Sequence, residues 1–241
     1  MSDPGLPRRA AAEVLGTGVL VAAVVGSGIM ATDLTDDLAL ALLVNALSTV
    51  AALGVLIWAL GPISGAHFNP AVTAVAWVRK EIRPSEGATY MVAQVAGALL
   101  GVALANVMFD LPAWQASTND RVALGTLVGE VVATAGLLAV IGALTRTGRG
   151  HLGPILVPAW IGAAYFFTAS TSFANPAVTI GRAFTDTFTG IAPASVAPFI
   201  AAQLVGAAVG ALLTEFFYPR RGVVPEPLDL PEPVHNPEGS S

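Results

Sequence analysis

Two copies of one pentapeptide, Asn-Pro-Ala-Val-Thr, lie at residues 69–73 and 175–179. Asparagine is a favoured N-cap and proline suits the first helical position, so each copy predicts the start of a helix. A helix N-terminus carries roughly half a positive charge, and an asparagine amide donates hydrogen bonds to oxygen atoms. Two such starts that meet would repel cations and hydrated protons but bind neutral molecules. The simpler alternative is that Asn69 and Asn175 only cap their helices, and the two roles are compatible.

Long apolar runs surround both motifs. The 241-residue chain is 54% hydrophobic and only 11% charged, whereas soluble domains carry about 25% charged residues. Six runs approach the roughly 20 residues that cross about 30 Å of hydrocarbon. They cover about 10–31, 38–60, 87–108, 122–144, 153–170 and 194–217. This pattern predicts an all-α membrane protein with six transmembrane helices.

The segments that begin at the two motifs, 70–79 and 176–184, are too short to be spans. At about 1.5 Å per residue each reaches some 14–15 Å, near half of the membrane. The chain is also an internal duplication, because residues 93–101 match residues 202–210. Three spans per half is an odd number, so the second half is inverted relative to the first. The two re-entrant half-helices therefore enter from opposite faces, and their N-termini meet near the midplane.

A single domain is expected over residues 1–218, with repeat 1 at about 8–110 and repeat 2 at about 120–218. The segment 219–241 is rich in proline and acidic residues and is expected to be a disordered tail. Most Lys and Arg residues fall on the side of the six-span arrangement that holds both termini. The positive-inside bias places that side in the cytoplasm.

Several function classes find no support in the residues. Cysteine is absent, which excludes disulfides and thiolate metal sites. No catalytic triad, phosphate-binding loop or metal cluster is recognisable, so neither an enzyme nor a cofactor is expected. The basic residues form short anchors rather than a nucleic-acid surface.

Two short membrane helices that each open on Asn-Pro-Ala resemble the aquaporin (major intrinsic protein) family, and the resemblance covers roughly residues 8–218. It implies a passive channel for water and small uncharged solutes in the bilayer of a bacterial inner membrane, assembled as a homotetramer with one pore per subunit. It also places His67 along the cytoplasmic half of the pore, although a lone histidine is more often a packing residue. The resemblance puts six motif residues at the pore centre: Asn69, Pro70, Ala71, Asn175, Pro176 and Ala177.

The constriction departs from the family pattern. Most members place Arg directly after the second Asn-Pro-Ala, where this chain has Val178. Spacing from the two asparagines carries the other three filter positions over to Thr49, Ala163 and Ser172. This set is small and nearly apolar, so it implies a wider filter without a fixed charge.

Arg182 follows Val178 by one helical turn, about 6 Å along the axis. It is expected either to line the outer vestibule or to pair with Asp186, and both readings stay open. Residues 173–182 and 185–191 also resemble a bacterial subgroup that lacks the filter arginine. Members of that subgroup are associated with arsenic resistance and pass arsenite-like solutes.

Glu13 and Glu130 lie at matching places in the first and fourth spans. A carboxylate inside a membrane is by default a functional-site hypothesis, and a secondary transporter of a small weak acid could use such groups. The family fold instead implies that each braces the backbone N–H groups of a half-helix loop, which is the favoured interpretation. A membrane scaffold with a closed pore is the third hypothesis.

Overall fold

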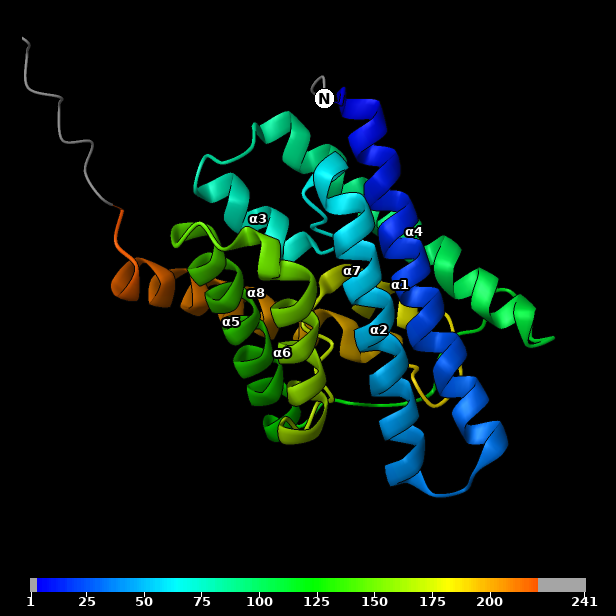
Figure 1. Ribbon diagram of the computed structural model, residues 1–241. Helices are drawn as coiled ribbons and strands as arrows, with labels where there is room; N and C mark the ends of the chain where they lie inside the picture. Colours follow the sequence, from blue (N-terminus) through cyan, green and yellow to red (C-terminus); the bar gives the residue numbers. More distant parts are fainter. Residues whose placement is uncertain (1–3, 221–241) are drawn as a thin grey trace, which may run out of the picture.

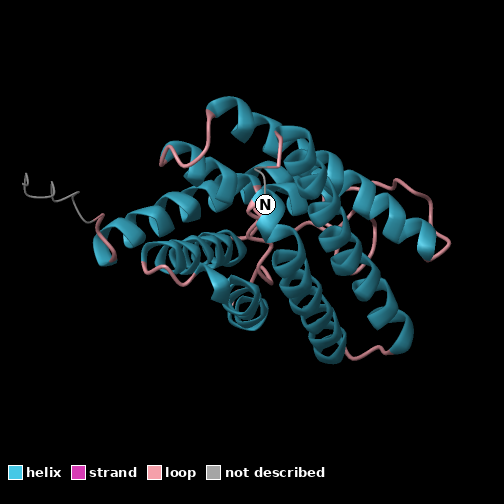
Figure 2. Ribbon diagram, turned by 45° about the horizontal axis from the view of Figure 1, so that its top comes forward, coloured by secondary structure: helices cyan, strands magenta, loops and turns pink. Residues whose placement is uncertain are grey.

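The computed structural model describes residues 4–220, and this part is entirely helical, which confirms the predicted all-α class (Figure 1). Residues 221–241, most of the expected tail, lie outside the described part. The helices in chain order are α1 (Leu6–Leu34), α2 (Leu38–Ser64), α3 (Pro70–Val78), α4 (Pro84–Met108), α5 (Leu124–Arg146), the short 3-10 helix η1 (Gly150–Leu152), α6 (Gly153–Phe167), α7 (Pro176–Arg182) and α8 (Pro193–Phe217). Figure 2 shows these helices joined by loops, without a strand anywhere in the described chain.

Six helical segments of the described chain are long and apolar enough to cross a membrane: α1, α2, α4, α5, η1 with α6, and α8. The two helices that open on the repeated motif are short, with nine residues in α3 and seven in α7. Six spans with two half-helices confirm the predicted arrangement. The helix ends differ from those expected by a few residues in both directions: α6 ends at Phe167 and α7 at Arg182, earlier than expected, whereas polar residues extend other helices beyond the apolar runs. Thus α1 begins at Leu6 and includes Arg8 and Arg9.

The duplication is visible in how the long helices pair. In the first half α1 packs against α4, and in the second half α5 packs against α8. Glycines allow these backbones to approach closely. A Cβ atom on Gly101 of α4 would lie 2.1 Å from the carbonyl oxygen of Gly18, and one on Gly210 of α8 would lie 2.3 Å from that of Ala135. The small residues at matching positions therefore set the same close helix crossing in both halves.

The two halves meet along α2 and α6, which pack against each other, and through α3 and α7. In Figure 1 the pair α1 and α2 lies beside the pair α5 and α6, and the short helices lie between the long ones. This arrangement brings the starts of α3 and α7 together in the interior.

Candidate pore

Each half-helix begins with an asparagine cap. The Asn69 Oδ1 atom accepts a hydrogen bond from the Ala71 N–H at 2.9 Å. The Asn175 Oδ1 atom accepts bonds from the N–H groups of Ala177, at 3.0 Å, and Val178, at 3.3 Å. The prolines that follow occupy the first helical turn, where an N–H group would have no helical partner. The side-chain oxygens thus satisfy the open donors of both helices and fix the orientation of both amides.

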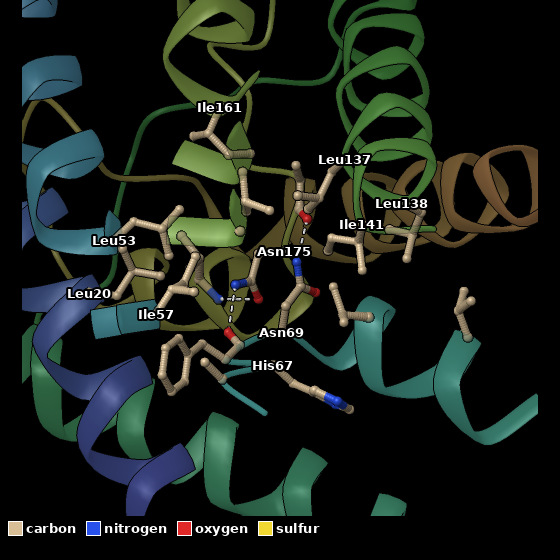
Figure 3. A pocket seen from close by; sticks show the side chains of 18 of the residues that line it. Leu20, Leu53, Ile57, His67, Asn69, Leu137, Leu138, Ile141, Ile161 and Asn175 are labelled. Atoms are coloured by element: carbon tan, nitrogen blue, oxygen red, sulfur yellow. Dashed lines mark hydrogen bonds between the residues drawn. The ribbon is translucent and has the colours of Figure 1, made fainter. Parts of the chain in front are cut away.

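The same two amides tie the halves together. The Asn69 Nδ2 atom donates to the Ala174 carbonyl at 2.8 Å, and the Asn175 Nδ2 atom donates to the Phe68 carbonyl at 2.8 Å. Figure 3 shows the two side chains lying next to each other, each with its amide nitrogen directed at a carbonyl of the other half, with these bonds as dashed lines. An amide carries two N–H donors, so each asparagine keeps a second donor. Both asparagines line one shared cavity.

The loops before α3 and α7 have the same strained backbone. Ala66 and Phe68 have φ of 51° and 47°, and the matching residues Ser172 and Ala174 have φ of 54° and 47°. Left-handed conformations at residues other than glycine cost on the order of 1–3 kcal/mol each and persist only where surrounding groups enforce them. The repeated strain therefore requires a fixed partner in each half.

Glu13 is that partner in the first half. Its carboxylate accepts hydrogen bonds from the His67 N–H at 3.0 Å and from the Phe68 N–H at 2.7 Å. The Ser64 hydroxyl and the Gln94 amide also donate to it, at 2.6 and 2.7 Å. The carboxylate is fully buried and is not among the groups that line the cavity.

Glu130 repeats the arrangement in the second half. It accepts from the N–H groups of Phe173 and Ala174 at 2.9 and 2.8 Å, and from the Gln203 amide at 2.6 Å. It is also fully buried. These contacts are those of a carboxylate that braces a loop. The two glutamines did not stand out as functional residues in the sequence, although Gln94 and Gln203 occupy the same place in the matched segments 93–101 and 202–210.

The cavity has a volume of about 320 Å³ and joins both half-helices. One wall is apolar and is supplied by long helices: Leu20, Leu53, Ile57, Leu137, Ile141 and Ile161. Figure 3 shows these side chains around the two asparagines. The loops supply hydrogen-bonding groups from Gly65 to Asn69 and from Ser172 to Asn175, and Thr49 and Tyr165 add two hydroxyls from α2 and α6. A molecule in the cavity therefore meets a polar strip along the loops and a mainly apolar wall along the long helices.

His67 lies on the α3 side of this polar strip and lines the cavity. Its Nδ1 atom is 3.0 Å from the hydroxyl of Thr73, and its ring meets that of Tyr90 edge to face, with centroids 5.3 Å apart. The ring is thus held in place by both contacts.

The residues assigned to the constriction do not all lie on the cavity. Thr49, Ser172 and Val178 line it. Ala163 does not, because its side chain is exposed on the outer face of α6, so the position obtained by spacing is wrong. Tyr165, two residues further along α6, lines the cavity instead. The signal that could have identified it is a tyrosine in an otherwise apolar span, since a buried hydroxyl needs a partner.

Arg182 also lines the cavity, near the end of α7, although its side chain is almost fully buried. Its Nε atom donates to the Thr189 carbonyl, and its guanidinium carbon lies 3.4 Å from the ring centroid of Phe173. The alternative pairing with Asp186 is absent. Asp186 instead accepts bonds from the N–H and hydroxyl of Thr118, at 2.8 and 2.9 Å.

These features define a multi-pass helical membrane protein in which two capped half-helices meet on the wall of a shared cavity. A family model described as "Major intrinsic protein" matches residues 1–173. The aquaglyceroporin AqpS of Rhizobium meliloti is 50% identical over 225 residues, which cover 93% of this chain and 96% of that protein. The chain belongs to the major intrinsic protein family, whose members are channels and not enzymes.

More distant relatives agree. Aquaporin TIP1-2 of Zea mays is 31% identical over 230 residues, with 90% of this chain and 89% of that protein covered. The X-ray structure of the aquaglyceroporin from Plasmodium falciparum aligns with a TM-score of 0.64 over 88% of this chain and 96% of that one. At 22% identity this likeness establishes the shared fold.

Proposed function

We propose that the protein is a passive channel for water and small uncharged solutes of glycerol or arsenite size. The observation that carries the proposal is the side chain of Val178, which lines the cavity in the first turn of α7. A short apolar group at this point leaves the neck wider than a long cationic side chain would. The polar strip supplies hydrogen bonds to solute hydroxyls, and the apolar wall faces their carbon skeleton.

The relatives support solutes larger than water. The 50% identical AqpS of Rhizobium meliloti is named an aquaglyceroporin, as is the Plasmodium falciparum protein of the same fold. The resemblance of residues 173–182 and 185–191 to arsenic-associated channels adds arsenite to the solutes worth testing.

Transport of a weak acid by Glu13 or Glu130 is less consistent with the geometry. A proton-coupled carboxylate must reach the substrate path, whereas both of these are buried behind the loops and bonded to backbone N–H groups. A closed scaffold is less consistent with a cavity that extends past both asparagines.

The placement in the cell follows from the charges. Arg8, Arg9 and Arg146 lie at helix ends on the side of the N-terminus, and by the positive-inside bias this supports cytoplasmic termini in a bacterial inner membrane. The homotetramer implied by the family is the expected assembly.

Stopped-flow light scattering on proteoliposomes, with water, glycerol, urea and arsenite as permeants, tests the function. Wild-type protein should exceed empty vesicles for water and for at least one solute. Val178→Arg should lower glycerol flux by about tenfold or more, which corresponds to about 1.4 kcal/mol, with a smaller effect on water. Val78→Arg is the matched control, because Val78 is exposed at the end of α3 and off the cavity. Equal glycerol flux in wild type and Val178→Arg would contradict the proposed neck.

A further inference from the structure

Arg182 is a buried cation that faces the cavity. Its side chain is 3% exposed, and it lines the cavity one turn beyond Val178. Its Nε–H is used by the Thr189 carbonyl, and its guanidinium stacks on the Phe173 ring. Both contacts hold the charge in place, and neither neutralises it.

No ion pair neutralises Arg182 either within residues 4–220. The ion pairs found there join Arg9 and Arg83 to Glu86, and Arg79 and Arg146 to Glu215. Glu130 interacts with Arg182 electrostatically, but its oxygens bond to the N–H groups of Phe173 and Ala174 and to Gln203.

A second guanidinium lies on the same aromatic ring. The Arg121 guanidinium carbon is 5.4 Å from the ring centroid of Phe173. Its Nε atom donates to the Gly190 carbonyl at 2.6 Å, and a terminal nitrogen donates to the Phe188 carbonyl at 2.9 Å. Arg121 is not among the residues that line the cavity. A second positive charge therefore lies near the cavity, and Arg182 is the one of the two that faces a permeant.

We propose that two residues one helical turn apart divide selection at the neck: Val178 limits solute size, and Arg182 repels cations in addition to the barrier at the half-helix ends. This inference rests on the proposed channel function. A single long arginine at the neck would impose both limits together. Here the residue that carries the charge follows Val178 by one helical turn, a rise of about 6 Å, so a short side chain lies at the neck while a positive charge lines the cavity next to it.

The test measures Na⁺ uptake and glycerol flux in the same proteoliposomes. Arg182→Gln removes the charge and keeps a polar side chain. It should raise the Na⁺-to-glycerol permeability ratio by roughly tenfold, because a unit charge that lines the cavity, in an effective dielectric near 20, repels a passing cation by at least that factor. Arg182→Lys restores the charge and should return the ratio toward wild type. Arg121→Gln removes an equal charge from the same ring, off the cavity and farther from a permeant, and should change the ratio by a smaller factor than Arg182→Gln does.

Val178→Leu tests the other limit, because it adds bulk without charge. It should lower glycerol flux relative to water and leave the Na⁺-to-water ratio unchanged. A wild-type ratio in Arg182→Gln, or an equal rise in Arg182→Gln and Arg121→Gln, would overturn the assignment of Arg182. If wild-type vesicles carry no water or glycerol above empty ones, the channel function itself fails, which is a separate result.

Discussion

The hydroxyl of Tyr165 donates a hydrogen bond to the Thr49 hydroxyl, 3.2 Å away, and this bond joins α6 to α2 across the wall of the cavity. Both side chains are buried, at 3% exposure each, and both line the cavity. The sequence analysis expected only small side chains at the neck. A tyrosine ring also lines the cavity there, beside Thr49.

Tyr165→Ala should therefore widen the pore. Loss of the ring removes the group that faces Thr49, so the glycerol-to-water permeability ratio should rise several times in stopped-flow assays. The matched control is Ala163→Leu, which adds bulk two residues away on the outer face of α6. Its ratio should equal that of wild type, and a fall in glycerol flux in Ala163→Leu would restore Ala163 to the constriction.

The misplacement of Ala163 shows where sequence reasoning fails. A count of twelve residues back from Asn175 assumes that the intervening chain keeps a constant path. Helix α6 ends at Phe167, and the loop then passes through left-handed residues at Thr171, Ser172 and Ala174. Such a loop changes which face of the helix corresponds to a given count. Val178 was easier to place, because it lies in the same helical turn as Asn175.

The global arrangement could be predicted because its signals are local and repeated. Hydrophobic length gives the spans, and the cap at Asn69 or Asn175 gives the start of each half-helix. The environment of Arg182 could not be predicted, because it depends on contacts with Phe173, nine residues earlier, and with Thr189, seven residues later. Only the folded loops bring those three residues together.

Glu130→Gln should destabilise the protein. The glutamine keeps one acceptor oxygen but turns an NH₂ group toward backbone donors, so the Phe173 or Ala174 N–H loses its partner in a strained loop. Leaving buried donors unsatisfied costs about 1–3 kcal/mol. In detergent, the midpoint of thermal unfolding should fall by roughly 3–9 °C.

The control for this prediction is Glu215→Gln. Glu215 pairs with Arg79 and Arg146, but its side chain is 43% exposed. Exposed pairs contribute about 0–1 kcal/mol, so the midpoint should change little. An equal fall of the unfolding midpoint in the two variants would mean that Glu130 contributes no more to stability than an exposed ion pair, and that it does not brace the loop.

Gly101→Ala should separate α1 from α4. The added Cβ atom would lie 2.1 Å from the Gly18 carbonyl oxygen, and a backbone atom moves only if the whole helix moves. Overpacking of this kind costs about 1–3 kcal/mol. Gly125→Ala is the same substitution in the first turn of α5, where the new Cβ atom would lie 3.8 Å from the Cβ atom of Ala169, an ordinary van der Waals contact, and alanine there gains up to about 1 kcal/mol of helix propensity. The two variants should thus shift the unfolding midpoint in opposite directions, and a shared direction would contradict the close crossing.

The final prediction concerns the charge at the centre of the pore. Asn175→Asp keeps an acceptor for the Ala177 and Val178 N–H groups, but it cannot donate to the Phe68 carbonyl, and it adds a negative charge to the lumen. The ends of α3 and α7 together carry about one positive charge, which excludes cations by on the order of 3 kcal/mol at about 5 Å. The new carboxylate cancels that charge, so Na⁺ permeability should rise by roughly a hundredfold, even with Arg182 unchanged.

Asn119→Asp provides the control, because Asn119 donates to the Thr187 carbonyl in a loop off the cavity. It makes the same chemical change away from the permeant, and its Na⁺ permeability should match that of wild type. If Asn175→Asp stays as tight to Na⁺ as Asn119→Asp while it still conducts water, the half-helix ends do not form the central barrier.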